Sequence, residues 1–142
     1  GTQTIAEKEP RLFFASTHQA PLYPGTGAAH ETGIDGNVVN APLPAAANGA
    51  RWRQAMETLV LPALDAFAPE LILVSAGFDA HRADPLAQME LEDADFAWAG
   101  STLRQVSLQH CKGKLVSTLE GGYDLAALAR SSASYLGALE RD

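Results

Sequence analysis

Short apolar runs alternate along the chain with longer amphipathic segments. The short runs suit buried strands, and the longer segments repeat apolar residues with the helical period. Strands separated by helices of this length indicate βαβ units and a sheet covered on both faces. We therefore expect one α/β domain over residues 1–142, in three α/β/α layers with a mainly parallel sheet. The pattern predicts strands at 12–17, 37–40, 70–75 and 115–119, and helices at 48–67, 92–111 and 124–139.

Several residues refine this pattern. Pro62 lies inside the first predicted helix and should kink it or divide it. Gly113 should end the second helix, and Asp124 is a plausible N-cap for the third. Residues 18–36 are rich in proline and glycine and should form a loop, whose length is typical of functional loops.

Composition narrows the class of protein. The net charge is -7, with 10 basic residues against 17 acidic ones, which argues against a broad nucleic-acid surface. The single cysteine, Cys111, reads as a buried small residue, excludes an internal disulfide and fits a reducing compartment, so we expect the cytoplasm. No apolar run approaches the 18 or so residues of a membrane span, and no signal peptide is visible.

Polar groups stand where three of the predicted strands end. They are residues 16–18, Asp79 and residues 120–123, and a parallel sheet would bring them to one edge, where ligands bind in such folds. Asp79 supplies a hard oxygen donor for a metal, or it caps the next segment. Tyr123, after two glycines, supplies a neutral donor for a developing oxyanion, or it packs at a helix start.

Three segments also resemble a known family. They are Ser-Ala-Gly-Phe-Asp-Ala-His-Arg-Ala-Asp-Pro-Leu at 75–86, Glu-Gly-Gly-Tyr-Asp-Leu at 120–125, and residues 14–27 with their Pro-Gly-Thr-Gly loop. All three look like motifs of the zinc-dependent histone deacetylase superfamily, which includes histone deacetylase-like amidohydrolases, acetylpolyamine amidohydrolases and acetoin-utilisation proteins. The resemblance implies an arginase/deacetylase-like fold. It also implies hydrolysis of acetyl amides on lysine, polyamine or a similar small molecule.

The resemblance assigns roles to particular residues. It implies that Asp79 is a zinc ligand and that Tyr123 polarises the substrate carbonyl. Ser16 and the carbonyl of Thr17 would help to hold a monovalent cation, K⁺ or Na⁺. His81, two residues after Asp79, is not a ligand in this family.

The resemblance also implies a channel for the acyl chain. Tyr23 would line it, since an aromatic wall suits a methylene chain, although a tyrosine between prolines is also typical of a loop anchor. Leu86 would form part of the opposite wall, and Gly121 and Gly122 would belong to the same channel.

The chain also departs from its family. A working enzyme needs two further zinc ligands from an Asp-x-His segment and a His-His pair for proton transfer. Neither an Asp-x-Asp-x-His-His segment nor a His-His pair occurs in the sequence. Gly1-Thr2-Gln3 resembles the tail of the family's His-His segment, or Gly1 is a cloning remnant. We therefore expect only the C-terminal portion of a deacetylase domain, inactive alone, with weak or no zinc binding.

Two other interpretations of the chain remain besides part of a deacetylase. Strands whose neighbours are missing become exposed edges, so the chain could be a non-catalytic α/β fragment that associates with itself. A nucleotide-binding domain is disfavoured, because neither G-x-G-x-x-G nor G-x-x-x-x-G-K-[ST] appears.

Overall fold

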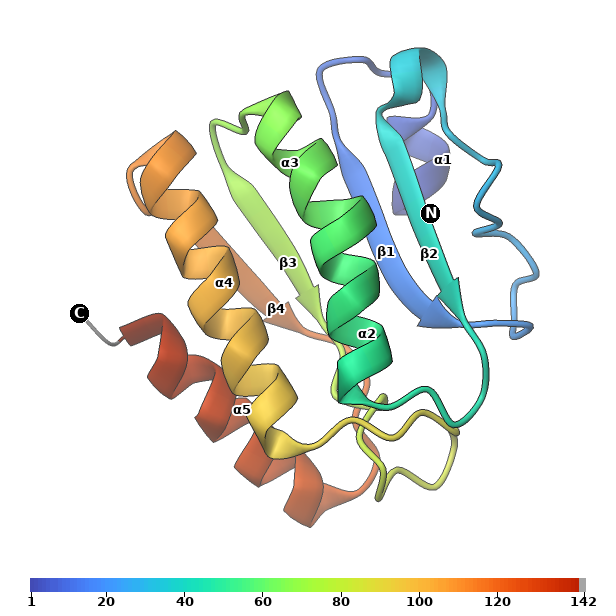
Figure 1. Cartoon of the computed structure of the whole chain (residues 1–142), viewed down its shortest axis with the longest axis vertical. Helices are drawn as coiled ribbons and strands as arrows, with labels where there is room; N and C mark the ends of the chain where they lie inside the picture. The colour runs from blue at the N-terminus through green and yellow to red at the C-terminus, as the bar shows by residue number, and fades with distance from the viewer. Residues whose placement is uncertain (141–142) are drawn as a thin grey trace.

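Four strands form a layer in the computed structural model, which describes residues 1–140 (Figure 1). They are β1 (Phe14–Gln19), β2 (Val38–Leu43), β3 (Ile72–Ala76) and β4 (Leu115–Leu119). Their arrowheads lie at the same end of the layer in Figure 1, so the carboxyl ends of the strands share one edge, as predicted.

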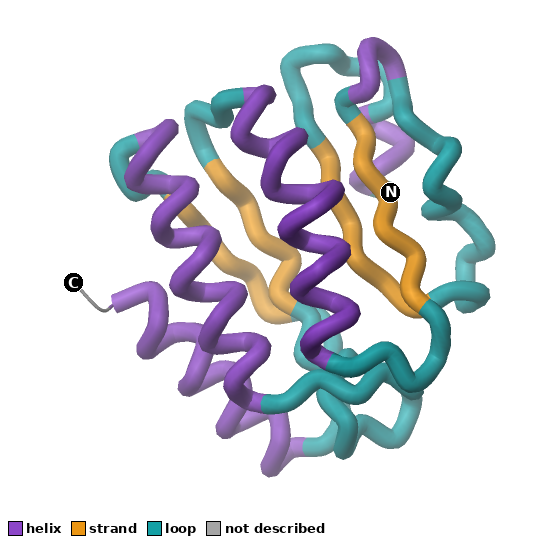
Figure 2. The backbone as a smooth tube through the Cα atoms, viewed as in Figure 1, coloured by secondary structure: helices purple, strands orange, loops and turns teal. Residues whose placement is uncertain are grey.

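The helices account for most of the remaining chain. They are α1 (Thr2–Ala6), α2 (Gly49–Ala55), α3 (Leu61–Phe67), α4 (Asp93–Cys111) and α5 (Leu125–Glu140), with a 3₁₀ turn η1 (Ile34–Gly36) and a π turn η2 (Met56–Val60). The tube view shows α2, α3 and α4 in front of the strands, while α1 lies behind β1 and β2 (Figure 2). None of the described helices has the length and apolar character needed to cross a membrane.

Hydrogen bonds join the strands in two parallel pairs. In the first pair, β1 runs beside β2 from Phe14 opposite Val38 to Gln19 opposite Leu43. In the second, β3 runs beside β4 from Ile72 opposite Leu115 onward. Within the described residues the two pairs are separate ladders, although β1 and β3 are neighbours in the layer. The predicted parallel α/β arrangement is confirmed.

The predicted second strand ended too early. β2 continues through Pro42 to Leu43, because a proline at this position removes no hydrogen bond from the ladder. Val38 donates its N–H outward to Thr32 O, 3.1 Å away, rather than to β1. Alternation along the strand places the nitrogen of Pro42 on the same outer side, where no ladder hydrogen bond is lost.

The first predicted helix is divided beside Pro62, as predicted. The π turn η2 ends at Val60 and α3 begins at Leu61, so Pro62 lies in the first turn of α3, where the missing N–H of a proline is tolerated. Asn48 caps the start of α2, since its Oδ1 accepts the N–H of Arg51 at 3.1 Å.

The other helix boundaries follow the sequence more closely. Asp124 is the N-cap of α5, as predicted, because its Oδ1 accepts the N–H of Ala127 at 2.7 Å. At the end of α4 the left-handed residue is Lys112, with φ 56°, and Gly113 follows it with φ 78°. The short helix α1 was not predicted. The side-chain nitrogen of Asn37 donates to the carbonyl of Ala6 and so holds the end of that helix, 2.7 Å away.

The core fills the space between the strands and the front helices. Leu91 is 1% exposed and belongs to one cluster with Phe78, Phe96 and Tyr135. The hydroxyl of Tyr135 lies 2.6 Å from the Oγ of Ser117 on β4. Burial raises the pKa of Tyr135 above its ordinary value of 10.0, and the hydrogen bond with Ser117 offsets only part of this rise. Cys111 is buried, as expected.

The two halves of the layer differ in how their rear faces are covered. Behind β1 and β2 lie α1 and its following segments. On β3 and β4 the alternating residues Leu73 and Val116 are 72% and 56% exposed, and Ser75 and Thr118 are exposed beside them. Among residues 1–140, then, the second outer layer is present only on one half. The expectation of a sheet covered on both faces is right for β1–β2 and wrong for β3–β4.

Candidate functional site

Asp79 lies just beyond the carboxyl end of β3, where two glycines make room for its side chain. The ladder continues past the strand, since Phe78 donates to the carbonyl of Gly121 at 2.9 Å. A Cβ atom placed on Gly121 would lie 2.7 Å from Cγ of Asp79, and one placed on Gly77 would lie 3.0 Å from its Oδ1. The structure therefore brings Asp79 and Gly121 together, with the carboxylate seated against backbone.

Tyr123 follows Gly121 and Gly122, beyond the carboxyl end of β4. Gly122 has φ +138°, and a Cβ there would lie 2.9 Å from the side chain of Leu128 and 3.2 Å from Phe78, so both conformation and space require glycine. The Tyr123 side chain is 56% exposed at the carboxyl-end edge of the layer. Its backbone N–H donates to Oδ2 of Asp84 at 2.9 Å.

The loop after Asp79 carries Leu86 and is tied down by a buried histidine. His81 accepts the N–H of Ala83 at Nδ1, 3.0 Å away, which leaves Nε2 to face Oδ1 of Asp93 at 3.2 Å. Both ring nitrogens of His81 therefore have partners within the protein, consistent with a structural histidine. Leu86 itself is exposed, which suits either a channel wall or an ordinary loop residue.

Asp93 joins this loop to the last helix. Its Oδ1 accepts from the hydroxyl of Ser131 at 2.9 Å, and its Oδ2 accepts from Nε of Arg130 at 3.0 Å. Burial acts to raise the pKa of Asp93, but the hydrogen bonds from Ser131 and Arg130 and the nearby positive charge outweigh it. The pKa consequently lies below its ordinary value of 3.8, and Asp93 stays ionised.

Ser16 and Thr17 belong to the other ladder, and their side chains have separate partners. The Ser16 hydroxyl lies 2.9 Å from Nδ1 of His18, whose Nε2 lies 3.0 Å from the carbonyl of Gly27. A carbonyl only accepts, so Nε2 carries the proton, and in the neutral ring Nδ1 accepts from Ser16. Thr17 Oγ1 accepts from the indole N–H of Trp52 at 2.9 Å.

Tyr23, the other predicted channel residue, stands clear of the protein. It is 98% exposed in the loop after β1. Asp79 lies against Gly121, and Asp84, in the loop after Asp79, accepts N–H groups of both Tyr123 and Leu86. Neither Tyr23 nor Ser16 takes part in these contacts.

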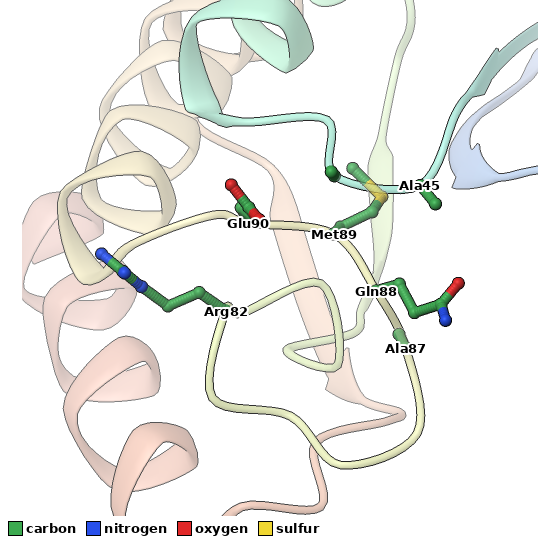
Figure 3. A pocket seen from close by; sticks show the side chains of 7 residues that line it. Ala45, Arg82, Ala87, Gln88, Met89 and Glu90 are labelled. Atoms are coloured by element: carbon green, nitrogen blue, oxygen red, sulfur yellow. The ribbon is translucent and has the colours of Figure 1, made fainter.

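Two hollows of the described surface lie beside this group rather than in it. One of about 370 Å³ lies between the segment after β2, at Ala45, and the loop at Arg82 and residues 87–90 (Figure 3). Neither Asp79 nor Tyr123 lines it. Over residues 1–140, no cluster of three or more His, Cys, Asp or Glu side chains could hold a metal ion. Among these described residues, Asp79 is not part of such a cluster.

Comparison with known proteins decides the family. The family model described as "Histone deacetylase domain" matches residues 1–139. The chain belongs to the histone deacetylase family. This confirms the resemblance drawn from residues 14–27, 75–86 and 120–125.

Individual relatives of the deacetylase family agree. "Histone deacetylase 10, chloroplastic" from Oryza sativa subsp. japonica is 40% identical over 136 residues, which are 94% of this chain and 31% of that protein. The crystal structure of the HDA15 HD domain has 34% identity and a TM-score of 0.89, covering 98% of this chain and 40% of that one. An acetylpolyamine aminohydrolase from Burkholderia pseudomallei has 28% identity and a TM-score of 0.86, over 98% and 41%.

The same comparisons show how much of each relative the chain covers. The deacetylase-like chain spans between 31% and 41% of the length of these three relatives. The solved structures confirm an incomplete α/β deacetylase fold, with parallel strands and flanking helices. Sequence reasoning missed Asp84 and Asp93, which hold the site's loops. The Asp84-Pro85 pair was a visible turn signal, but its partner lies far along the chain.

Proposed function

We propose that residues 1–142 form the C-terminal part of a zinc-dependent deacetylase domain that hydrolyses acetyl amides of lysine, polyamines or similar small molecules. The observation that carries this proposal is the meeting of Asp79 with Gly121, beside Tyr123, at the carboxyl ends of β3 and β4. A carboxylate and a phenol held at one edge match what amide hydrolysis requires, a metal ligand and an oxyanion donor.

In this proposal Asp79 is one zinc ligand. Its carboxylate, seated against Gly77 and Gly121, is a suitable oxygen donor, but one carboxylate does not hold zinc. The remaining ligands and the histidine pair would come from the portion of the domain beyond these residues. When bound, zinc supplies a Lewis acid for the acyl carbonyl and the attacking water. Tyr123 would donate a hydrogen bond to the oxygen on which negative charge develops.

The neighbouring residues would guide the substrate. The exposed side chains of Leu86 and Tyr23 suit apolar walls for an acyl-bearing methylene chain, and Gly121 and Gly122 would let it pass close to backbone. Ser16 and Thr17 are proposed to help hold K⁺ or Na⁺. The Thr17 carbonyl points away from β2, since alternate residues of β1, from Phe14 to Ala20, bond to that strand.

Zinc analysis together with an acetyl-lysine peptide assay tests the proposal. We expect the isolated chain to bind less than stoichiometric zinc and to release no acetate. The longest gene product containing these 142 residues should bind zinc and turn the peptide over, and Asp79→Ala should abolish both. Stoichiometric zinc and turnover by the isolated chain would overturn the proposed division of the site.

Self-association is the second proposal, and it rests on the uncovered β3–β4 face. Leu73 and Val116 are register partners that expose an apolar pair, and the ladder edge beside them is unpaired within residues 1–140. A second copy of the chain would cover this face. Sedimentation velocity should show a dimer or larger species that the double variant Leu73→Lys, Val116→Lys shifts to monomer. The matched control Leu125→Lys, at another exposed leucine, should leave it unchanged; equal effects of both would refute this face.

The remaining proposals concern location and partners. The single buried cysteine fits a reducing compartment, for which we propose the cytoplasm. The net charge of -7 argues against nucleic acid as a partner.

A further inference from the structure

Asp84 links two segments that are distant in sequence. Its Oδ1 accepts the N–H groups of Leu86 and Ala87, at 2.9 and 3.2 Å. Its Oδ2 accepts the N–H of Tyr123, at 2.9 Å, across 39 residues of sequence. One carboxylate therefore satisfies three backbone donors, on the loop after β3 and on the loop after β4.

Both linked segments carry residues of the proposed site. Tyr123 is the proposed oxyanion donor, and Leu86 is the proposed channel wall. The loop of Asp84 is itself anchored, since Asp84 N donates to the carbonyl of His81 at 2.9 Å, and His81 is buried against Asp93. Through Asp84, the backbone of Tyr123 is therefore hydrogen-bonded to an anchored loop rather than to solvent.

The geometry points to Asp84 as a positioning residue that sets where Tyr123 stands relative to Leu86. This inference rests on the proposed role of Tyr123, because Asp84 acts through the tyrosine and has no contact of its own with the reacting atoms. Gly122, immediately before Tyr123, has no side chain with which to hold the tyrosine in place, and its φ of +138° excludes one. A charge-assisted hydrogen bond from the Tyr123 amide then holds the residue in place.

The chemistry of the side chain explains why aspartate suits this place. Both oxygens of a carboxylate accept, so both loops are held at once. In Asp84→Asn one oxygen becomes an NH₂ group that donates only, so either the Leu86–Ala87 pair or Tyr123 loses its acceptor. The asparagine variant keeps the volume and shape, which separates the loss of the link from a packing defect.

Amide hydrogen exchange in the 142-residue chain tests the link. We expect exchange at Tyr123 to accelerate about fivefold in Asp84→Ala, with matching acceleration at Leu86 and Ala87. In Asp84→Asn one of the two sites should be affected. Asp124→Asn is the matched control, because the Asp124 side chain accepts the N–H of Ala127, within its own helix, and the substitution should leave Leu86 unchanged. An unchanged rate at Tyr123 in both Asp84 variants would overturn the inference.

A kinetic double-mutant cycle in the longest gene product tests whether Asp84 acts through Tyr123. Asp84→Asn should lower kcat on the order of tenfold with little change in KM, because a misplaced donor weakens the transition state more than substrate binding. Combined with Tyr123→Phe, it should lower kcat no further than Tyr123→Phe alone. Additive losses would refute positioning through Tyr123. Absence of any deacetylation by the unaltered gene product would instead refute the proposed function, while the exchange result would still decide the link.

Discussion

Replacing Gly121 by alanine forces a methyl group toward the Asp79 carboxylate. The new Cβ would lie 2.7 Å from Cγ of Asp79, whereas carbon atoms in ordinary contact lie about 3.5–4.0 Å apart. Gly121 is absent from the residues with positive φ, so alanine meets no backbone strain there. The carboxylate must therefore shift by about 1 Å, and overpacking of this kind destabilises by ~1–3 kcal/mol.

Native-state hydrogen exchange at the β3 and β4 amides measures this effect where it arises. Gly121→Ala should lower the free energy of opening by ~1–3 kcal/mol. In an Asp79→Ala background the same substitution should lower it by less than ~0.5 kcal/mol, because the clash is gone. Gly137→Ala, in α5 with nothing within 4 Å of the added Cβ, should instead stabilise by ~0.5–1 kcal/mol. Equal losses with and without the Asp79 carboxylate would refute the reasoning.

Three further predictions concern the core and its ionisable groups. Leu91→Ala should destabilise by ~2–5 kcal/mol in urea unfolding, since the side chain is 1% exposed. Tyr135→Phe should cost ~0.5–1.5 kcal/mol at neutral pH. Because the pKa of Tyr135 is raised in the fold, the extra stability of the wild-type protein over Tyr135→Phe should be lost as pH rises above 10.0. The pKa of Asp93 is lowered in the fold, so the stability that Asp93 contributes is present above pH 3.8 and lost as pH falls below it. In thermal melts, Asp93→Asn should therefore lower the melting temperature at neutral pH and reduce its dependence on pH in acid.

Local patterns were sufficient to predict most of the fold. The strand at 115–119 and the helix begun by Asp124 are where apolar alternation and capping chemistry placed them. The errors have tertiary causes. β2 runs on through Pro42 because that nitrogen faces outward, and the rear face of β3–β4 is bare because nothing among residues 1–140 packs on it. A sequence pattern states which side of a strand is apolar, but not whether a partner covers it.

The site was predictable in its parts but not in its connections. Asp79 and Tyr123 are recognisable in the sequence because each comes shortly after a predicted strand and each belongs to a family motif. The carboxylate of Asp84 reaches Tyr123 across 39 residues, and no local signal relates the two. Likewise, the partners of His81 at Ala83 and Asp93 appear only once the loop has closed on α4.

The break between the two ladders has a consequence for how the chain unfolds. Ladder hydrogen bonds join β1 to β2 and β3 to β4, but within the described residues none joins the two pairs. The halves are linked beyond the strands, where residues 46–47 are hydrogen-bonded to residues 88–90, and by α2 and α3, which lie in front of the layer. Each pair is therefore a candidate cooperative unit that can open while the other stays closed. Amide exchange should then distinguish the β1–β2 pair from the β3–β4 pair. The rings of Trp52 in α2 and Trp98 in α4 lie 5.5 Å apart, so their fluorescence should report the contact between the two halves.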